Sequence, residues 1–452
     1  MTINTSRFEL VLSQKLAQVG ASTSNLDLLK YSSALEKIRS GTVFVVSTFS
    51  SLPDAALNLG KLYFVQDSEE LFWSNAEYGW VSMYPGSVNK AWTWGGNACG
   101  QLGDDTQVSR SSPGTVSASV FNWCQVSAGR YINAAVKFDG TAWTWGKNSY
   151  GQLGNNSTAA RCSPGPLAGS NECWCQIHAS DTHAAGVKTD GTAWTWGRNH
   201  CGQLGNNTTV DRSSPGTTEG GGTTWCQISA GNIHTAAIKT DGTAWTWGNN
   251  PFGQLGDGTV TCRSSPVTIL GTITTWCQID AGNIHTVAIK TDGAAWTWGS
   301  NQFGVLGDGT VTYRSSPGQV AGFNSNWCQI SAGWQVAGTS FTSAVKKDGT
   351  AWTWGSNEFG QLGDGTVTYR SSPVSVSGGG TTWCDISSGA NHTAAVKTDG
   401  TAWTWGRNTC GQLGDSTVVN KSSPVATSGV NANWCQINAG GYNTIAIQSI
   451  TF

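Results

Sequence analysis

The tetrapeptide Trp-Thr-Trp-Gly recurs seven times and divides most of this chain into nearly identical units. Successive copies are 51 residues apart, apart from one step of 56, and they begin at Trp92, Trp143, Trp194, Trp245, Trp296, Trp352 and Trp403. A Gly-Gln-Leu-Gly block follows nearly every copy, and a Trp-Cys pair comes later in each unit. Repeats of this length, built from short runs and glycine turns, are typical of propeller blades. The sequence therefore predicts a mainly β chain with a seven-bladed β-propeller.

One unit, residues 225–266, shows the strands expected in a blade. A type I′ turn at Asp241-Gly242 is expected to join two of them, because Asp-Gly tolerates positive φ values. Trp245 and Trp247 are two residues apart and share one strand face, which predicts that they pack between neighbouring blades. The expected strands are 226–230, 234–239, 244–247 and an outer strand that follows Arg263.

The first and last units are incomplete in a complementary way. The chain ends after 443–448, where every other unit continues into an Asp-Gly turn and a Trp-Thr-Trp-Gly strand. The segment 91–95 is such a strand, with no hairpin partner before it. We therefore expect 91–95 to pair with 444–448 and close the ring, because closure removes exposed sheet edges.

The repeat resembles that of the regulator of chromosome condensation (RCC1) family. The resemblance lies in Trp-Gly-x-Asn-x-x-Gly-Gln-Leu-Gly-Asp-Gly-Thr at 247–259 and 354–366, and in Ser-Ala-Gly-x-x-His-Thr-Ala-Ala at 229–237. It covers residues 90–452 and implies a seven-bladed propeller. It implies much less about function, because propellers of this family serve as exchange factors, ubiquitin-ligase modules and binding scaffolds.

Composition and charge argue against a nucleic-acid partner. Charged residues make up 12% of the chain, and the formal net charge is −2. The sequence contains no basic block, so the electrostatic footprint of nucleic-acid binding is missing.

The thirteen cysteines are expected to be buried free thiols. Neighbouring packed sheets lie about 10 Å apart, beyond the separation of about 7 Å between Cα atoms that a disulfide spans. Cys173 and Cys175 form the one close pair, but Cys175 is a repeat position, so no metal site is expected. The repeat cysteines are Cys124, Cys175, Cys226, Cys277, Cys328, Cys384 and Cys435.

Four of the six histidines also follow the repeat, and His178 and His200 are isolated. His183, His234, His285 and His392 share one position, which Ile132, Phe341 and Asn443 occupy in the other units. A position that accepts isoleucine and phenylalanine is structural rather than catalytic. The aspartates of the Asp-Gly turns are explained by turn chemistry. No catalytic constellation stands out from the repeat, so we expect no enzyme activity and no cofactor.

Residues 1–40 are predicted to form two short amphipathic helices that attach to a partner or to copies of themselves, giving a homo-oligomer. Packing on the small domain that follows is the alternative. The sequence has no signal peptide and no run long enough to span a membrane. The apolar positions are Phe8, Val11, Leu12, Leu16 and Val19 in the first helix, and Leu28, Tyr31, Leu35 and Ile38 in the second.

Residues 41–84 are predicted to form a small β module, with strands at 43–49, 61–66, 71–74 and 80–83. The stretch 50–65, continued by 71–74 and 79–81, resembles small β modules of bacteriophage tail-fibre and other virion proteins. A short hinge at 85–89 would then join this attachment region to the propeller at 90–452.

These features lead to the prediction of a bacteriophage virion structural protein, located on the tail or capsid surface. Residues 1–84 would bind other virion proteins, and the propeller would contact a host glycan or protein. An intracellular exchange factor or adaptor is the first alternative, although its GTPase partner would call for a long loop or wedge. A carbohydrate-processing enzyme is the second, but no pair of acidic residues suited to it is evident.

Trp334 and Gln335 are the candidate receptor contacts. They begin a five-residue insertion, and Trp334 is the only propeller tryptophan outside the repeat pattern. Insertions in repeats map to loops, where binding residues are usually found. The alternative is that Trp334 folds back to plug the central channel.

Overall fold

A computed structural model describes residues 43–46, 62–65, 70–75, 79–82 and 88–450, the last range without 118–121, 170–172, 221, 272–274, 323–325, 335–339, 379 and 430–432. The chain divides into two compact units, 1–88 with 450–452, and 89–449. The expected N-terminal helices and most of the expected hinge lie outside the described residues.

The smaller unit contains a four-stranded sheet in the order β1-β2-β3-β4. The strands β1 and β2 are parallel, with Val43 opposite Leu62, whereas β2–β3 and β3–β4 are antiparallel. All four strands predicted between 43 and 83 are present. They are β1 (Val43–Val46), β2 (Leu62–Val65), β3 (Glu70–Asn75) and β4 (Gly79–Ser82).

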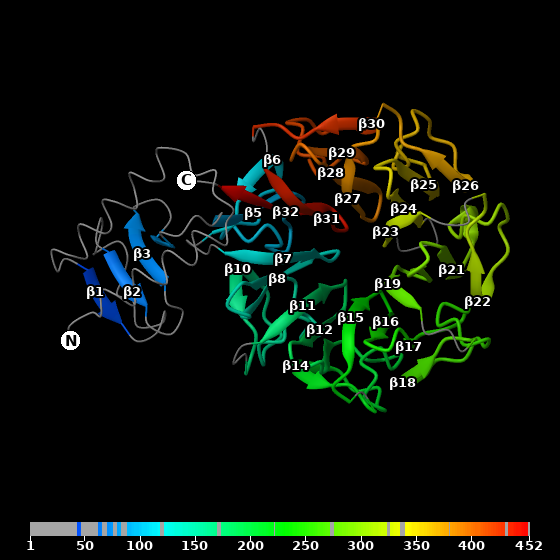
Figure 1. Ribbon diagram of the computed structural model, residues 1–452, viewed down its shortest axis with the longest axis horizontal. Coiled ribbons are helices and arrows are strands. Elements are labelled where there is room, and N and C mark those ends of the chain that lie inside the picture. Colours follow the sequence, from blue (N-terminus) through cyan, green and yellow to red (C-terminus); the bar gives the residue numbers. More distant parts are fainter. Residues whose placement is uncertain are drawn as a thin grey trace. The chain divides into compact units, whose positions relative to one another are not determined.

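The larger unit is a ring of seven four-stranded antiparallel sheets, which confirms the predicted propeller (Figure 1). The first strands, which lie nearest the centre, are β7 (Trp123–Ala128), β11 (Trp174–Ala179), β15 (Trp225–Ala230), β19 (Trp276–Ala281), β23 (Trp327–Ala332), β27 (Trp383–Ser388) and β31 (Trp434–Ala439). The second strands are β8 (Ile132–Lys137), β12 (His183–Lys188), β16 (His234–Lys239), β20 (His285–Lys290), β24 (Phe341–Lys346), β28 (His392–Lys397) and β32 (Asn443–Ile450).

The outer half of each blade contains the Trp-Thr-Trp-Gly strand and a fourth strand, which begins Arg-Ser-Ser-Pro in all blades but two, where it begins Arg-Cys-Ser-Pro (β10) or Lys-Ser-Ser-Pro (β30). The third strands are β9 (Ala142–Gly146), β13 (Ala193–Gly197), β17 (Ala244–Gly248), β21 (Ala295–Gly299), β25 (Ala351–Gly355), β29 (Ala402–Gly406) and β5 (Val88–Gly95). The fourth strands are β10 (Arg161–Pro166), β14 (Arg212–Thr217), β18 (Arg263–Thr268), β22 (Arg314–Gln319), β26 (Arg370–Ser375), β30 (Lys421–Ala426) and β6 (Arg110–Thr115). A 3₁₀ turn, η3 (Gln302–Gly304), lies between β21 and β22.

Both ends of the propeller segment build the seventh blade, whose order is β31-β32-β5-β6. The predicted closure of the ring is therefore confirmed. The seam is well packed, since Ile445 and Ile447 lie in one buried cluster with Ala91 and with Trp123 of blade 1. We number the blades 1 to 7 from β7–β10 to this composite blade.

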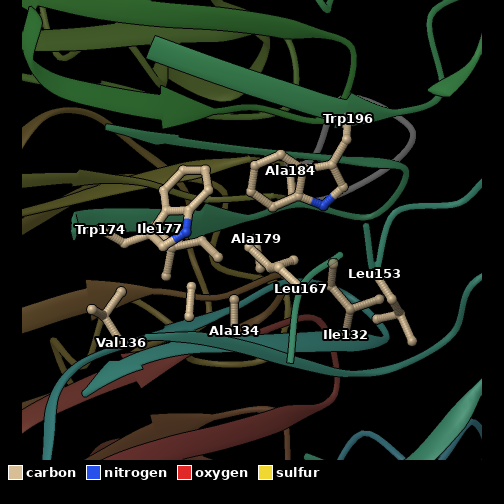
Figure 2. Packing of buried hydrophobic residues seen from close by; sticks show 11 residues of the cluster. Ile132, Ala134, Val136, Leu153, Leu167, Trp174, Ile177, Ala179, Ala184 and Trp196 are labelled. Carbon is tan, nitrogen blue, oxygen red and sulfur yellow. The ribbon is translucent and has the colours of Figure 1, made fainter. Parts of the chain in front are cut away.

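Apolar layers between neighbouring blades form the core. Figure 2 shows the layer between blades 1 and 2, where Trp174 and Trp196 lie over Ile132, Ala134 and other apolar side chains of blade 1. The rings of Trp174 and Trp196 meet edge-on at 5.8 Å, a favoured geometry for aromatic pairs. The Trp196 indole N–H donates to the Gln152 carbonyl of blade 1 at 2.9 Å. The tryptophans of the repeat thus pack between blades, as predicted.

The last glycine of each Gly-Gln-Leu-Gly block makes room for such an indole. Gly154 has φ +62°, and a Cβ there would lie 2.7 Å from Nε1 of Trp196. A larger residue would therefore separate two blades.

The hairpin turns differ from the predicted type I′. In blade 3 the Gly242 N–H donates to the Lys239 carbonyl at 2.9 Å, and of the turn residues only Gly242 has positive φ. A type I′ turn needs positive φ at both central residues, whereas a type I turn followed by a left-handed glycine needs it once. The Asp241 carboxylate accepts hydrogen bonds from the N–H and hydroxyl of Thr243, which fixes this turn.

None of the thirteen cysteines is disulfide-bonded, but the prediction that the repeat cysteines are buried is wrong. The register of β15 and β16 shifts between Trp225 and Gln227, and this bulge turns Cys226 outward. Its thiol donates to the Ile238 carbonyl at 3.4 Å. All seven repeat cysteines are exposed in this way.

Removal of residues 444–452 should lower the melting temperature by roughly 10 °C or more, because the loss of β32 leaves two strands unpaired and a blade interface wet. Thermal unfolding followed by circular dichroism measures the change. A peptide containing residues 443–452, added in excess, should partly restore the melting temperature. Unchanged stability of the truncated protein would contradict closure through β32.

Candidate functional site

The innermost strand of every blade is a sheet edge, and its amides are satisfied by side chains of the preceding blade. The third residue of each first strand accepts a hydrogen bond from the N–H of the fourth residue in the next blade, at 2.8 to 3.1 Å. Seven such bonds form a complete ring. The acceptors are Gln125, Gln176, Gln227, Gln278, Gln329, Asp385 and Gln436.

A second complete ring of bonds lies two residues further along the same strands. The fifth residue of each first strand accepts from the N–H of the sixth residue in the next blade, at 2.7 to 3.2 Å. The residue type at this fifth position varies from blade to blade, but each of the seven side chains offers an acceptor atom. The acceptors are Ser127, His178, Ser229, Asp280, Ser331, Ser387 and Asn438.

The repeat histidines form a third set of contacts between blades. The Nε2 atom of His234, for example, lies 2.9 Å from the Thr286 hydroxyl of blade 4, and that hydroxyl donates to the Gln254 carbonyl. Burial lowers the pKa of His183, His234, His285 and His392 to about 3. These imidazoles are therefore neutral at physiological pH, in keeping with the structural role predicted for them.

Side chains of blades 2, 4 and 5 meet at the centre of the ring. The Trp334 ring from blade 5 stacks on His178 from blade 2, with centroids 5.8 Å apart and planes 4° apart. The His178 Nε2 lies 3.8 Å from an Asp280 carboxylate oxygen of blade 4. Because blade 2 is a neighbour of neither blade 4 nor blade 5, both contacts of His178 cross the centre. Burial lowers the pKa of His178, and its Nδ1 accepts from Ala230, which places the proton on Nε2.

The candidate contact Trp334 is only 7% exposed. Its ring offers little surface to a receptor, so the geometry favours the alternative in which Trp334 plugs the centre. Gln335 lies outside the described residues, as do the attachment positions Phe8, Val11, Leu12, Leu16, Leu28, Tyr31, Leu35 and Ile38. Receptor contact and N-terminal attachment therefore stay predictions.

The two ends of the blades differ. One end, which we call the turn face, contains the Asp-Gly turns. In most blades a lysine on this face lies over two tryptophans. Lys239, for instance, is 4.3 Å from the Trp245 ring centre. The other end, the loop face, contains the connections between first and second strands and between third and fourth strands. The two faces therefore present different chemistry.

The long loops of the loop face are built around a buried asparagine. In blade 3 the Asn250 amide donates to the Asp257 carboxylate and to two backbone carbonyls, and its oxygen accepts from the Leu255 N–H at 2.9 Å. Arg263 forms a 2.9 Å ion pair with the same aspartate. These bonds explain the Asn and Asp of the repeat motif, and they make the loops fixed supports.

Aromatic rings and cations alternate across the loop face from blade 5 to blade 1, around the closure seam. The successive distances from cation to ring centre are 5.0, 5.7, 5.7, 5.1 and 5.3 Å. We call this series the cation–aromatic ladder. Its members are, in order, Phe359, Arg407, Tyr442, Arg130, Tyr131 and Lys147.

The ladder was not predicted from the sequence. Its contacts join residues as far apart as Arg130 and Tyr442, whose side chains also approach at 3.5 Å. A weak signal was present, because the position that follows Trp-Thr-Trp-Gly is cationic only in blades 1, 2 and 6. The residues at that position are Lys147, Arg198, Asn249, Ser300, Ser356, Arg407 and, in blade 7, Gly96.

Among the described residues, no group of three or more histidine, cysteine or acidic side chains could hold a metal ion. In the same part of the chain, no helix is long and apolar enough to cross a membrane.

A family model for the RCC1-like domain matches residues 86–337, and one for the regulator of chromosome condensation (RCC1) repeat matches 348–396 and 399–447. The chain belongs to the RCC1 family. It is 32% identical over 339 residues to the ultraviolet-B receptor UVR8 of Arabidopsis thaliana, covering 74% of this chain and 76% of the receptor.

A second relative and a solved structure show how widely this propeller is used. The E3 ubiquitin-protein ligase HERC2 of Mus musculus is 28% identical over 352 residues, which are 75% of this chain but 7% of that ligase. The structure of human WBSCR16 aligns with a TM-score of 0.70 at 19% identity, covering 80% of this RCC1-family chain and 98% of that one. The last likeness concerns the fold alone.

Replacement of Trp334 by Ala should destabilise the RCC1-type ring by about 2–4 kcal/mol, because it removes a buried aromatic ring that spans non-adjacent blades. Urea unfolding followed by fluorescence measures this loss. Phe138→Ala is the matched control, since Phe138 is 65% exposed and its removal should change little. A Trp334→Ala variant as stable as the Phe138→Ala variant would exclude the plug.

Asp385 makes the first ring of bonds sensitive to pH. Burial raises the pKa of this carboxyl, although hydrogen bonds from Gln329 and Ile437 oppose the shift. The folded protein therefore binds this proton more tightly than the unfolded chain. The stabilising effect of the proton is present at low pH and is lost as pH rises through the raised folded pKa.

Replacement of Asp385 by Gln, the residue in the other six blades, should raise the free energy of unfolding at pH 7 by on the order of 1 kcal/mol. The advantage over the wild type should shrink as pH falls toward 4. Asp241→Asn should instead lower the free energy of unfolding at pH 7, because hydrogen bonds from Thr243 favour the ionised carboxylate and lower the pKa of Asp241. Urea unfolding at both pH values measures the differences, and an advantage of Asp385→Gln that does not vary with pH would refute this explanation.

Proposed function

We propose that this protein is a non-enzymatic RCC1-type scaffold that binds a partner protein on its loop face. One observation carries the proposal. The blades use the same residues at their interfaces and along most of the turn face, whereas the loop face differs from blade to blade and contains the cation–aromatic ladder. Exposed residues that depart from a rigid repeat are where binding specificity is expected.

The adaptor role is favoured over an exchange factor. An exchange factor would call for a projecting loop or wedge, and the insertion that starts at Trp334 begins by packing into the centre of the ring. Trp334 also donates its backbone N–H to Gly389 of blade 6, so the start of the insertion is tied to the ring.

The comparisons agree better with this role than with a virion protein. The relatives are a photoreceptor and a ubiquitin ligase, and both share the propeller with this chain. Neither points to a bacteriophage particle. Virion location, attachment through residues 1–40 and homo-oligomer formation stay predictions for the N-terminal region.

Photo-crosslinking from each face tests the scaffold role. A benzophenone amino acid replaces the exposed Glu358 on the loop face or the exposed Phe138 on the turn face, in the full-length protein within its native cells. We expect a discrete protein adduct from position 358 and none from position 138, read by gel shift and mass spectrometry. Adducts only from position 138 would overturn the proposal. A crosslinked GTPase whose nucleotide release is accelerated would favour the exchange-factor alternative.

A further inference from the structure

Contacts with aromatic rings hold the Arg407 guanidinium of the ladder in place without using its terminal N–H groups. Arg130, by contrast, already donates Nη1 to Asp181 and Nη2 to Tyr442, each at 3.5 Å. Arg407 lies 5.0 Å from the Phe359 ring centre and 5.7 Å from that of Tyr442. Its Nε donates to the Thr409 hydroxyl at 3.0 Å, and none of the described residues accepts a hydrogen bond from its terminal nitrogens. A guanidinium stacked on aromatic rings keeps its in-plane N–H groups free for a planar acid.

We propose that this ladder is a binding site for a carboxylate-rich segment of a partner protein, with Arg407 as the main contact and Arg130, which is already paired with Asp181, as a second cation. The inference rests on the scaffold function proposed above and names the chemistry of the partner.

The ladder is preformed. Tyr131 and Tyr442 lie with ring centres 5.7 Å apart, and Arg130 is within 5.7 Å of both. Two glycines make room for it. A Cβ on Gly441 would lie 2.5 Å from Cγ of Arg130, and one on Gly96 would lie 3.1 Å from Cβ of Tyr442. Preformed cations cost little ordering entropy on binding.

The charge of the ladder exceeds what its neighbours neutralise. It contains three cations, and among the ion pairs of the described residues only Asp181 meets one of them, 3.5 Å from Arg130. No acid lies within ion-pair distance of Arg407 or Lys147 among the ion pairs of the described residues. Outside the ladder, blades 3 and 4 have the uncharged Asn249 and Ser300 at the equivalent position, whereas blade 2 has one further cation, Arg198, 4.6 Å from the Tyr150 ring centre. Complementary charge would therefore direct an anionic partner to blades 5 to 1.

A short acidic peptide fits this surface better than a nucleic acid. Binding of a phosphate backbone needs a continuous basic track, whereas the chain has a net charge of −2, and Asp181 and the exposed Glu358 adjoin the ladder. Each aromatic ring of the ladder already has a cation within 5.7 Å, so a base would have to displace it in order to stack. Two or three carboxylates match the number of cations.

Fluorescence anisotropy of labelled peptides on the full-length protein tests the site. The probe is a peptide of about ten alternating Asp and Glu residues, and its control replaces each acid by Asn or Gln. At about 50 mM NaCl we expect the acidic peptide to bind at least tenfold more tightly than the control, with weaker binding at about 300 mM. Equal affinity for the two peptides would overturn the inference.

Substitutions locate the binding on the ladder. Arg407→Gln should weaken binding about tenfold, as expected for loss of a charge-assisted contact. Arg407→Lys keeps the charge but not the planar fork, so it should lose a smaller factor. Lys239→Gln is the matched control, because it removes a cation over aromatic rings on the turn face and should leave affinity unchanged. Melting temperatures establish that each variant is folded.

Three outcomes would contradict the inference while leaving the scaffold proposal intact. The first is acidic-peptide binding that Arg407→Gln does not weaken. The second is tighter binding of heparin or of a single-stranded oligonucleotide through Arg407, which would replace the carboxylate partner by a sulfate or phosphate one. The third is no peptide binding although position 358 still crosslinks to a protein. Loss of loop-face crosslinks, by contrast, would remove the scaffold function itself.

Discussion

The backbone N–H groups on the inner edge of every blade are the constraint on which the propeller depends. A four-stranded sheet cannot pair its first strand on both sides, and an exposed edge leaves polar groups without partners. Here side chains of the preceding blade accept hydrogen bonds from two N–H groups of each first strand. The same two bonds join every pair of neighbouring blades, and Gln436 and Asn438 of blade 7 make them to blade 1. Because each blade completes its neighbour, a ring with one blade missing would leave buried amides unsatisfied.

The same constraint separates the residues that build the fold from those that are free to vary. The second ring accepts Ser, His, Asp or Asn, because only an acceptor atom at the right place is required. The tryptophans fill the apolar layers on both sides of each sheet, and the buried asparagines fix the loops. Side chains on the outside of those loops have no part in either task. Their identity can therefore change without cost to the ring.

Much of this fold could be predicted from the sequence, because the repeat period, the strand pattern and the complementary ends each depend on local spacing. The structural role of the histidines followed from Ile132 and Phe341 at the same position. The turn type did not follow, because it depends on the sign of φ at Thr240 and Asp241. The exposure of Cys226 did not follow either, because it depends on a bulge in β15 that residue identity does not reveal. The hydrogen-bonding role of Gln227 was missed for another reason, because its partner Ile279 belongs to the next unit.

The ladder shows why sites on repeat proteins are harder to predict than their folds. Four consecutive blades contribute to it, and closure of the ring brings Tyr442 beside Arg130 although they are at opposite ends of the propeller sequence. No single unit contains the site, so comparison of one repeat with another shows only isolated departures, such as Arg407 where blade 5 has Ser356. Those departures gain meaning only when the ring order is known. In a closed propeller, exceptions to the repeat should therefore be read around the ring rather than along the chain.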